Sequence, residues 1–135
     1  MMPILIRTWH LANGLKVEIF DDTVAYYGDW STLKLMIRCK IEVRKEYVGA
    51  FAAHPRYNEV VEALGSEAEY LREITKPGVP GRNLAGVKAF LVERFEENAL
   101  GYFEREDFAE KFIHKKFEEI EEEISRKDRP GDGDL

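Results

Sequence analysis

Residues 54–57 combine side chains that bind anions and exchange protons. An imidazole, a guanidinium and a phenol in a loop before a predicted helix can hold an anion or act as a general acid or base. His54, Arg56 and Tyr57 are therefore candidate site residues. The alternative, which we favour, is that His54 caps the helix and that Arg56 is solvated.

Residues 76–83 form a second candidate segment, a predicted Pro- and Gly-rich loop that precedes another predicted helix. Lys76 and Arg82 flank it. Backbone N–H groups around Gly78 and Gly81, together with the helix dipole, could hold a phosphate or a carboxylate. The segment matches neither the Walker A nor the dinucleotide-binding pattern, and we favour a rigid structural loop. If both segments met, they would form one site for a small anionic ligand or an active site.

The other titratable residues predict no catalytic grouping and no metal centre. His10, His54 and His114 lack a second histidine at a ligand spacing, and the H-E-x-x-H motif is absent. The single cysteine, Cys39, lies in an apolar run, where it acts as a small hydrophobic residue. We therefore expect no cofactor, and we favour a protein that is not an enzyme.

Aromatic and basic residues gather on one face of the predicted N-terminal sheet. Such a face can stack bases and hold phosphates. It can equally be an apolar patch that a helix, another segment or another subunit covers, and we favour this second interpretation because exposed apolar patches mark interfaces. A register shift of one residue would invert the assignment. The candidate surface is Arg7, Trp9, Phe20, Lys34, Met36, Arg38 and Lys40.

The register behind this surface comes from Asn13-Gly14, which separates two apolar runs. Asn-Gly predicts a two-residue type I′ hairpin, because that turn needs positive φ at both central residues. Counting outward from such a turn places Trp9 opposite Glu18 and Arg7 opposite Phe20.

Periodicity predicts the remaining elements. Residues 21–23 and 28–29 are predicted turns, and apolar residues alternate from Leu33 to Val43 as in a half-buried strand. Helices are predicted from Pro55, from Asn83 as N-cap, and from Asp107 as N-cap. Residues 68–75 fit either a strand or a helix, and we lean towards a strand.

The predicted fold class is α+β: an N-terminal antiparallel β-meander of about four strands, followed by about three helices packed on one face. We expect residues 1–125 to form a single domain and residues 126–135 to be a polar, disordered tail.

Composition restricts the function further. The 135 residues carry a net charge of −6. Residues 1–50 contribute +1 (seven basic, six acidic), and residues 51–135 contribute −7 (thirteen basic, twenty acidic), which argues against broad nucleic-acid binding. No stretch predicts a signal peptide or a membrane span, and one cysteine suits a reducing, cytoplasmic location. We expect a binding or regulatory module that forms a homo-oligomer or binds a protein partner, with nucleic-acid binding or a small anionic ligand as alternatives.

Overall fold

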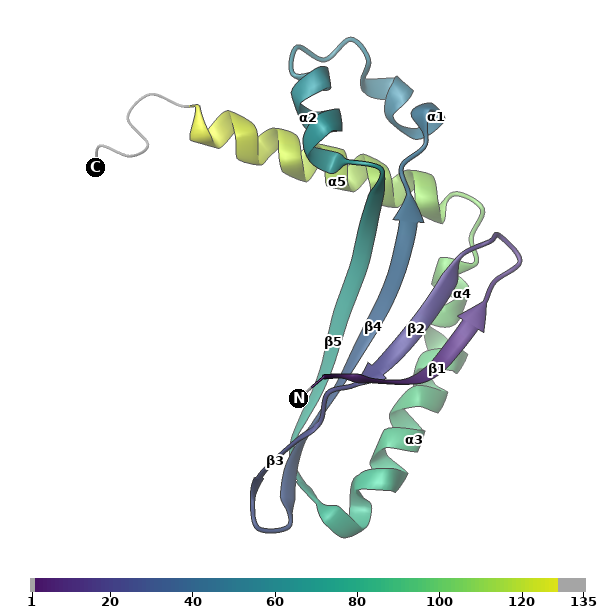
Figure 1. Ribbon diagram of the computed structural model, residues 1–135. Helices are drawn as coiled ribbons and strands as arrows, with labels where there is room; N and C mark the ends of the chain where they lie inside the picture. Colours follow the sequence, from purple (N-terminus) through teal and green to yellow (C-terminus); the bar gives the residue numbers. More distant parts are fainter. Residues whose placement is uncertain (1, 129–135) are drawn as a thin grey trace. The chain divides into compact units, whose positions relative to one another are not determined.

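A computed structural model describes residues 2–128 and has the predicted α+β class (Figure 1). An antiparallel sheet contains five strands, and α3, α4 and α5 follow it. The strands are β1 (Ile4–His10), β2 (Lys16–Asp21), β3 (Val24–Tyr27), β4 (Trp30–Glu42) and β5 (Glu67–Pro80). The helices are α1 (Lys45–Val48), the 3-10 turn η1 (Gly49–Phe51), α2 (Tyr57–Leu64), α3 (Gly81–Asn98), α4 (Leu100–Phe103) and α5 (Phe108–Lys127).

The chain divides into two compact units, each assembled from two stretches of sequence. The first unit comprises Met1–Lys40 and Glu69–Glu106, and the second comprises Ile41–Ala68 and Asp107–Leu135. The single domain expected for residues 1–125 stays a prediction. The tail was expected to begin at residue 126, but α5 continues to Lys127. Residues 129–135 lie outside the described part of the chain.

Strand β4 confirms the predicted alternation except at Val43, which lies beyond the end of the strand at Glu42. Its side chains from Leu33 to Ile41 are alternately buried and partly exposed. Strand β2 pairs with it from Val17↔Cys39 to Asp21↔Leu35, and β3 continues in the same register at Val24↔Thr32.

The turn predicted at residues 21–23 is therefore wrong, because the chain does not reverse there. Polar groups in this segment bond to each other and to β4 instead. The Asp21 carboxylate accepts the Thr23 N–H at 3.0 Å, and the Lys34 N–H donates to Thr23 Oγ1 at 3.2 Å. The Asp22 N–H donates to the Lys34 carbonyl at 2.8 Å, which keeps the segment aligned with β4.

The β1–β2 hairpin has a three-residue loop, which corrects the predicted type I′ turn. The Leu11 N–H donates to the Leu15 carbonyl at 2.9 Å, so Ala12, Asn13 and Gly14 form the loop. Gly14 has φ 88° and no described non-glycine residue has positive φ, as in a type I turn followed by one left-handed glycine. The Asn13 side chain accepts from the Leu15 N–H and donates to the carbonyl of Phe103 in α4 at 2.7 Å.

The longer loop shifts the register by one residue. Trp9 faces Val17 and Arg7 faces Ile19, rather than Glu18 and Phe20. Because neighbouring side chains point to opposite faces, this shift moves Trp9 and Arg7 to the face that carries the buried residues of β2. A bulge between Leu5 and Arg7 changes the register again, so that Leu5 pairs with Phe20 and lies on the face opposite to Arg7.

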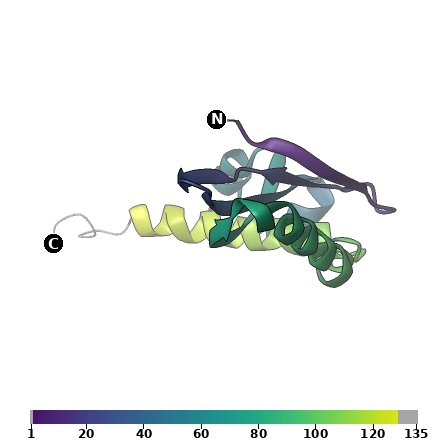
Figure 2. The same cartoon turned by 90° about the horizontal axis from the view of Figure 1, so that it is seen from below.

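Strand β5 confirms the preference for a strand at residues 68–75, but it continues through the predicted loop to Pro80. Proline is tolerated there because β5 pairs with β4 and borders the sheet. Helix α3 then begins at Gly81, so Asn83 is not its N-cap. Figure 2 shows α3 below the strands of the first unit, in a separate layer. Its Phe95 and the α4 residue Phe103 are buried, and their rings are 6.1 Å apart.

The second unit is helical apart from the ends of β4 and β5. Helix α5 packs against α1 and α2, with Ile113 and Phe117 buried. The Phe117 ring stacks on Phe51 at 4.2 Å. Asp107 occupies the N-cap of α5 as predicted, but its carboxylate forms no capping hydrogen bond. Within residues 2–128, no helix combines the length and the apolar character needed to cross a bilayer.

Candidate functional site

The first unit leaves one face of its sheet without α3 packed on it, and we call this face the open face. Strand pairing assigns its residues, because directly paired side chains lie on the same face. Phe20 pairs with Met36 and with Leu5, and Tyr27 pairs with Trp30. The open face also includes Val24, Thr32, Lys34, Arg38 and Lys40.

A pocket of about 230 Å³ lies on the open face. The Arg38 guanidinium lies 5.6 Å from the centre of the Phe20 ring and donates from Nε to Glu69 Oε1 at 3.0 Å. Glu69 and Leu71 come from β5, which places this strand beside β4 at the pocket. The full lining is Met2, Pro3, Phe20, Met36, Arg38 and Leu71.

The open face is unusually apolar for a solvent-facing side of an antiparallel sheet, which normally carries polar side chains. Each strand contributes at least one large apolar residue. Tyr27 is 78% exposed and Leu71 is 54% exposed, so they are not core residues that only graze the surface. The apolar members are Leu5, Phe20, Val24, Tyr27, Trp30, Met36 and Leu71.

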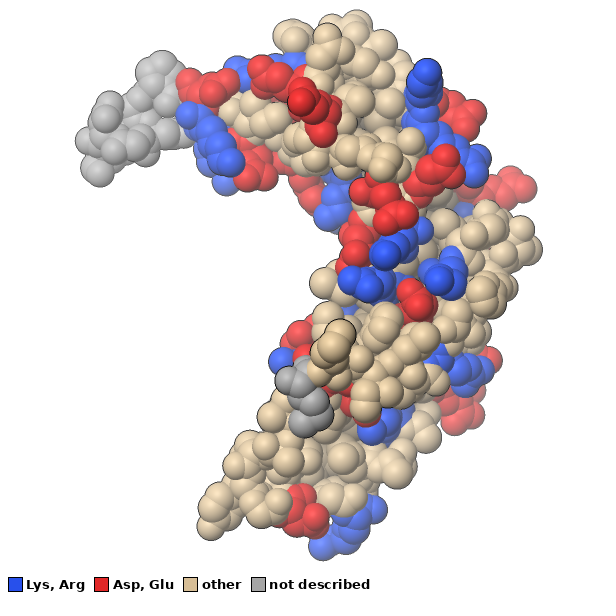
Figure 3. All heavy atoms as spheres, viewed as in Figure 1, with Lys and Arg blue, Asp and Glu red and all other residues tan. Residues whose placement is uncertain are grey.

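The space-filling view in Figure 3 is mostly tan around β3 and the neighbouring strand ends, where few charged side chains are visible. Moreover, every strongly exposed large apolar side chain within residues 2–128 belongs to the first unit. Large apolar side chains exposed together on one face often mark an interaction site.

The surface predicted from sequence is divided between two faces. Phe20, Lys34, Met36, Arg38 and Lys40 lie on the open face as predicted. The assignment of Arg7 and Trp9 to it is wrong, for the reason of register given above.

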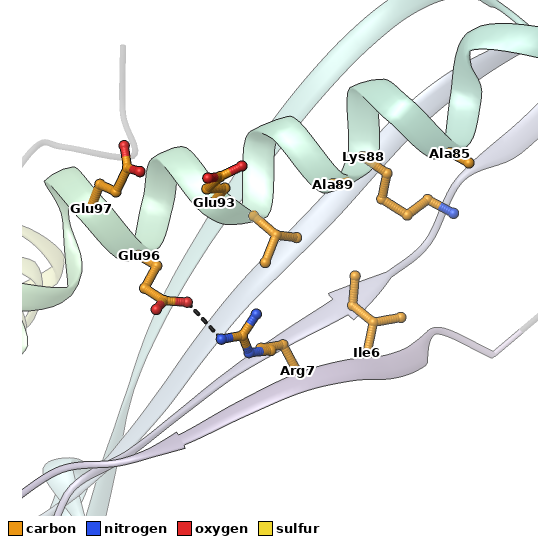
Figure 4. A pocket seen from close by; sticks show the side chains of 9 residues that line it. Ile6, Arg7, Ala85, Lys88, Ala89, Glu93, Glu96 and Glu97 are labelled. Atoms are coloured by element: carbon orange, nitrogen blue, oxygen red, sulfur yellow. Dashed lines mark hydrogen bonds and ion pairs between the residues drawn. The ribbon is translucent and has the colours of Figure 1, made fainter.

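Both misassigned side chains contact α3. The Trp9 ring lies 5.4 Å from the Phe95 ring, and its Nε1 donates to Glu96 at 3.3 Å. The Arg7 guanidinium donates to the same carboxylate at 2.6 Å, inside a groove of about 640 Å³ between β1 and α3 (Figure 4). These contacts hold β1 against the helix and leave neither side chain on the open face.

Sequence reasoning missed Leu71 and Glu69 at the pocket. A strand was favoured for residues 68–75, but nothing in the sequence shows that this strand pairs with β4. Val24 of β3, which is also absent from the predicted surface, is exposed on the open face.

The first anion-binding segment lies in the second unit, and acidic residues already surround it. The Arg56 guanidinium binds Asp128 at 2.6 Å and Glu59 at 3.4 Å, and its side chain is 30% exposed. His54 Nδ1 accepts the Arg56 N–H at 3.1 Å, and its Nε2 lies 3.6 Å from Glu121. His54 therefore braces the residue before α2 without capping the helix itself, and Tyr57 is the first residue of α2.

The second segment lies in the first unit, at the junction of β5 and α3. The Gly81 N–H donates to the Asp29 carbonyl at 2.7 Å, and a Cβ on Gly81 would overlap the Asp29 carboxylate. Gly78 has φ 68°, which explains a glycine there. Asp29 thus already lies against the start of α3, and the side chains of Lys76 and Arg82 are exposed. Because the two segments belong to different units, a joint site stays a prediction.

Cys39 and the acidic residues offer no separate chemistry. Cys39 is fully buried, and burial together with the nearby Glu18 raises the pKa of its thiol to about 11, so the reactive thiolate is scarce at neutral pH. Across residues 2–128, no group of three or more potential metal-ligating His, Cys, Asp or Glu residues is present.

Comparison with protein-family models, with curated proteins and with solved structures gives no match to this chain.

Proposed function

We propose that this protein is a non-enzymatic binding module that associates with another polypeptide through the open face of its first unit. The observation that carries the proposal is the row of apolar side chains on all the strands of one solvent-facing sheet surface. Covering such a surface removes apolar area from water, which is favourable by about 25 cal/mol for each Å² buried. A cytoplasmic location, inferred from the single cysteine, is part of this proposal.

The arrangement of the open face resembles the anatomy of known interfaces. Phe20, Met36 and Leu71 form an apolar centre, and Arg38 and Glu69 pair beside it. Protein interfaces combine an apolar centre with a polar rim in this way. Tyr27 and Trp30 add exposed aromatic side chains, the residue types that most often dominate binding energies.

The two alternatives have weaker support. A nucleic-acid interface on the open face would lack Arg7 and Trp9, because both contact Glu96 on the other face. Arg38 is less able to bind a phosphate because it is paired with Glu69. A small anionic ligand would meet Asp128, Glu59 and Glu121 around residues 54–57, whose negative charge repels it.

The test compares two substitutions at equally exposed apolar positions. Leu71 is 54% exposed on the open face, and Phe90 is 55% exposed on α3. Glu at position 90 would lie four residues before Arg94, a favourable helical spacing, so Phe90→Glu is a mild control. Native mass spectrometry after one gentle purification step should detect a bound polypeptide with the wild type and Phe90→Glu, and none with Leu71→Glu.

A retained small molecule or oligonucleotide, with no bound polypeptide, would contradict the proposal. So would polypeptide binding that Leu71→Glu leaves unchanged. Circular dichroism of each variant checks that the fold persists, which is expected because both side chains are exposed.

A further inference from the structure

The charge of the chain is distributed unequally between the two units. The first unit contains eleven Lys and Arg residues and eleven Asp and Glu residues, and its net charge is zero. The second unit contains nine basic and fifteen acidic residues, which accounts for the whole net charge of −6. The unit that exposes apolar side chains therefore has no net charge to repel a copy of itself.

The open face itself carries charges of both signs around its apolar centre. Lys34, Arg38 and Lys40 provide positive charge, and Glu18 and Glu69 provide negative charge. A partner whose charges are mostly of one sign, such as a polyanion, would meet both attractive and repulsive charges on this face. A second copy meets charges of both signs, because a two-fold interface brings each residue of one copy opposite residues of the same face.

The size of the apolar patch is also adequate for self-association. Seven large apolar side chains contribute to it, and five of them are 44–78% exposed, so they still have apolar surface to bury. A standard interface buries roughly 800 Å² on each partner, and only a little more than half of that area is apolar. Sheets also pack face to face in this manner within β-sandwiches, about 10 Å apart.

We propose that the partner of the open face is a second copy of this chain, so that two first units pack open face against open face in a symmetric dimer. This inference rests on the proposed function and specifies its partner. Phe20, Met36 and Leu71 are then buried in the centre, and Tyr27 and Trp30 lose solvent contact.

The first experiment is analytical ultracentrifugation of the full chain over a range of concentrations. The wild type should approach twice 15.7 kDa as concentration rises. Leu71→Glu should raise the dimer dissociation constant at least about 100-fold, since a two-fold interface buries the side chain twice and the new charge loses its hydration. Phe90→Glu should change it less than about threefold, as expected for a surface substitution outside the interface.

A second experiment places the contact at the open face without adding charge. The chain has two tryptophans, Trp30 on the open face and Trp9 against Phe95 on the other side. Trp9→Phe leaves Trp30 as the only reporter, and its emission should shift to longer wavelength as dilution separates the dimer. Trp30→Phe leaves Trp9, whose emission should not depend on concentration.

The outcomes separate this inference from the proposed function. A monomer at every concentration, with a different polypeptide bound through Leu71, overturns the dimer and leaves the proposed function standing. A monomer with no bound polypeptide overturns both. A dimer that Leu71→Glu does not weaken, or a Trp30 emission that is independent of concentration, shows a different interface and overturns the inference.

Discussion

The two units of the chain treat their aromatic and apolar residues in opposite ways. In the second unit, Phe117 is buried and stacks on Phe51, while the surface of α5 carries ion pairs between exposed residues. In the first unit, Tyr27, Trp30 and Leu71 remain exposed although the unit also has a buried core. The large apolar side chains that are exposed within residues 2–128 therefore all belong to the first unit, and the proposed association depends on this difference.

The comparison also shows why whole-chain composition was a poor guide. A net charge of −6 suggests a uniformly acidic protein, but the charge belongs to one unit. Each unit combines two distant stretches of sequence, so dividing the sequence at residue 50 could not separate them. The residues of the open face share one surface only through strand pairing, which joins positions far apart in the sequence.

The largest predicted effect tests the contrast between buried and exposed phenylalanines. Phe117 is 1% exposed in the second unit, and Phe117→Ala should lower the free energy of unfolding by about 3–5 kcal/mol, because it removes a ring from a packed core. Phe90→Ala in the first unit should cost less than about 1 kcal/mol, since that ring is already in water. Urea denaturation monitored by circular dichroism measures both.

If Phe117→Ala leaves too little folded protein, Phe117→Leu serves as a milder change with a cost of about 1 kcal/mol. Equal costs for positions 117 and 90 would contradict the contrast between the units.

The second prediction concerns ion pairs, which also differ between the units. In the first unit, Lys88 of α3 donates to the Asp21 carboxylate of β2 at 2.5 Å, and both side chains are mostly buried. Partial burial opposes ionisation of Asp21, but the hydrogen bonds from Lys88 and Thr23 outweigh it and lower the pKa of the carboxyl below its ordinary value of 3.8. In the second unit, the Lys127–Glu123 pair is largely exposed and lies on one helix.

Asp21→Asn should therefore lower the free energy of unfolding by about 1.5–3 kcal/mol at neutral pH, as for a hydrogen bond to a charged group. A native pKa below the ordinary value means that this stabilisation is present above pH 3.8 and is lost as pH falls through the native pKa. Lys127→Ala should cost less than about 0.5 kcal/mol. Urea denaturation at neutral and acidic pH measures these differences.

Lys88→Ala in the Asp21→Asn background should have little further effect if the two residues act as a pair. A pH-independent cost of Asp21→Asn would show that its effect comes from packing and would refute the electrostatic explanation.

The sequence predicted those elements whose signals are local. The alternation from Leu33 to Ile41 identified β4, because period 2 over many residues fits only a half-buried strand. It also placed Met36 and Arg38 correctly on the open face, since the parity of one strand does not depend on its neighbours.

What the sequence could not predict depends on distant contacts. The hairpin loop has three residues and not the predicted two, and its Asn13 side chain bonds to the carbonyl of Phe103, ninety positions away. This extra residue shifts the β1–β2 register by one and determines the face on which Arg7 and Trp9 lie. Leu71 was missed for a similar reason, because the pairing of β5 with β4 spans a long, helix-containing segment.

The smallest predicted effects test whether the start of α3 depends on its contact with the β3–β4 turn. Gly81 and Gly86 both lie in α3, but a Cβ at Gly81 would overlap the Asp29 carboxylate, whereas a Cβ at Gly86 would meet nothing within 4 Å. Gly86→Ala should therefore stabilise the protein by about 0.5–1 kcal/mol, the usual gain for alanine inside a helix. Gly81→Ala should destabilise it by about 1 kcal/mol, because the Asp29 side chain must move aside. Thermal unfolding distinguishes the opposite signs. Adding Asp29→Ala should remove the penalty at Gly81; if it does not, the close approach of the two backbones, and not the carboxylate, requires the glycine.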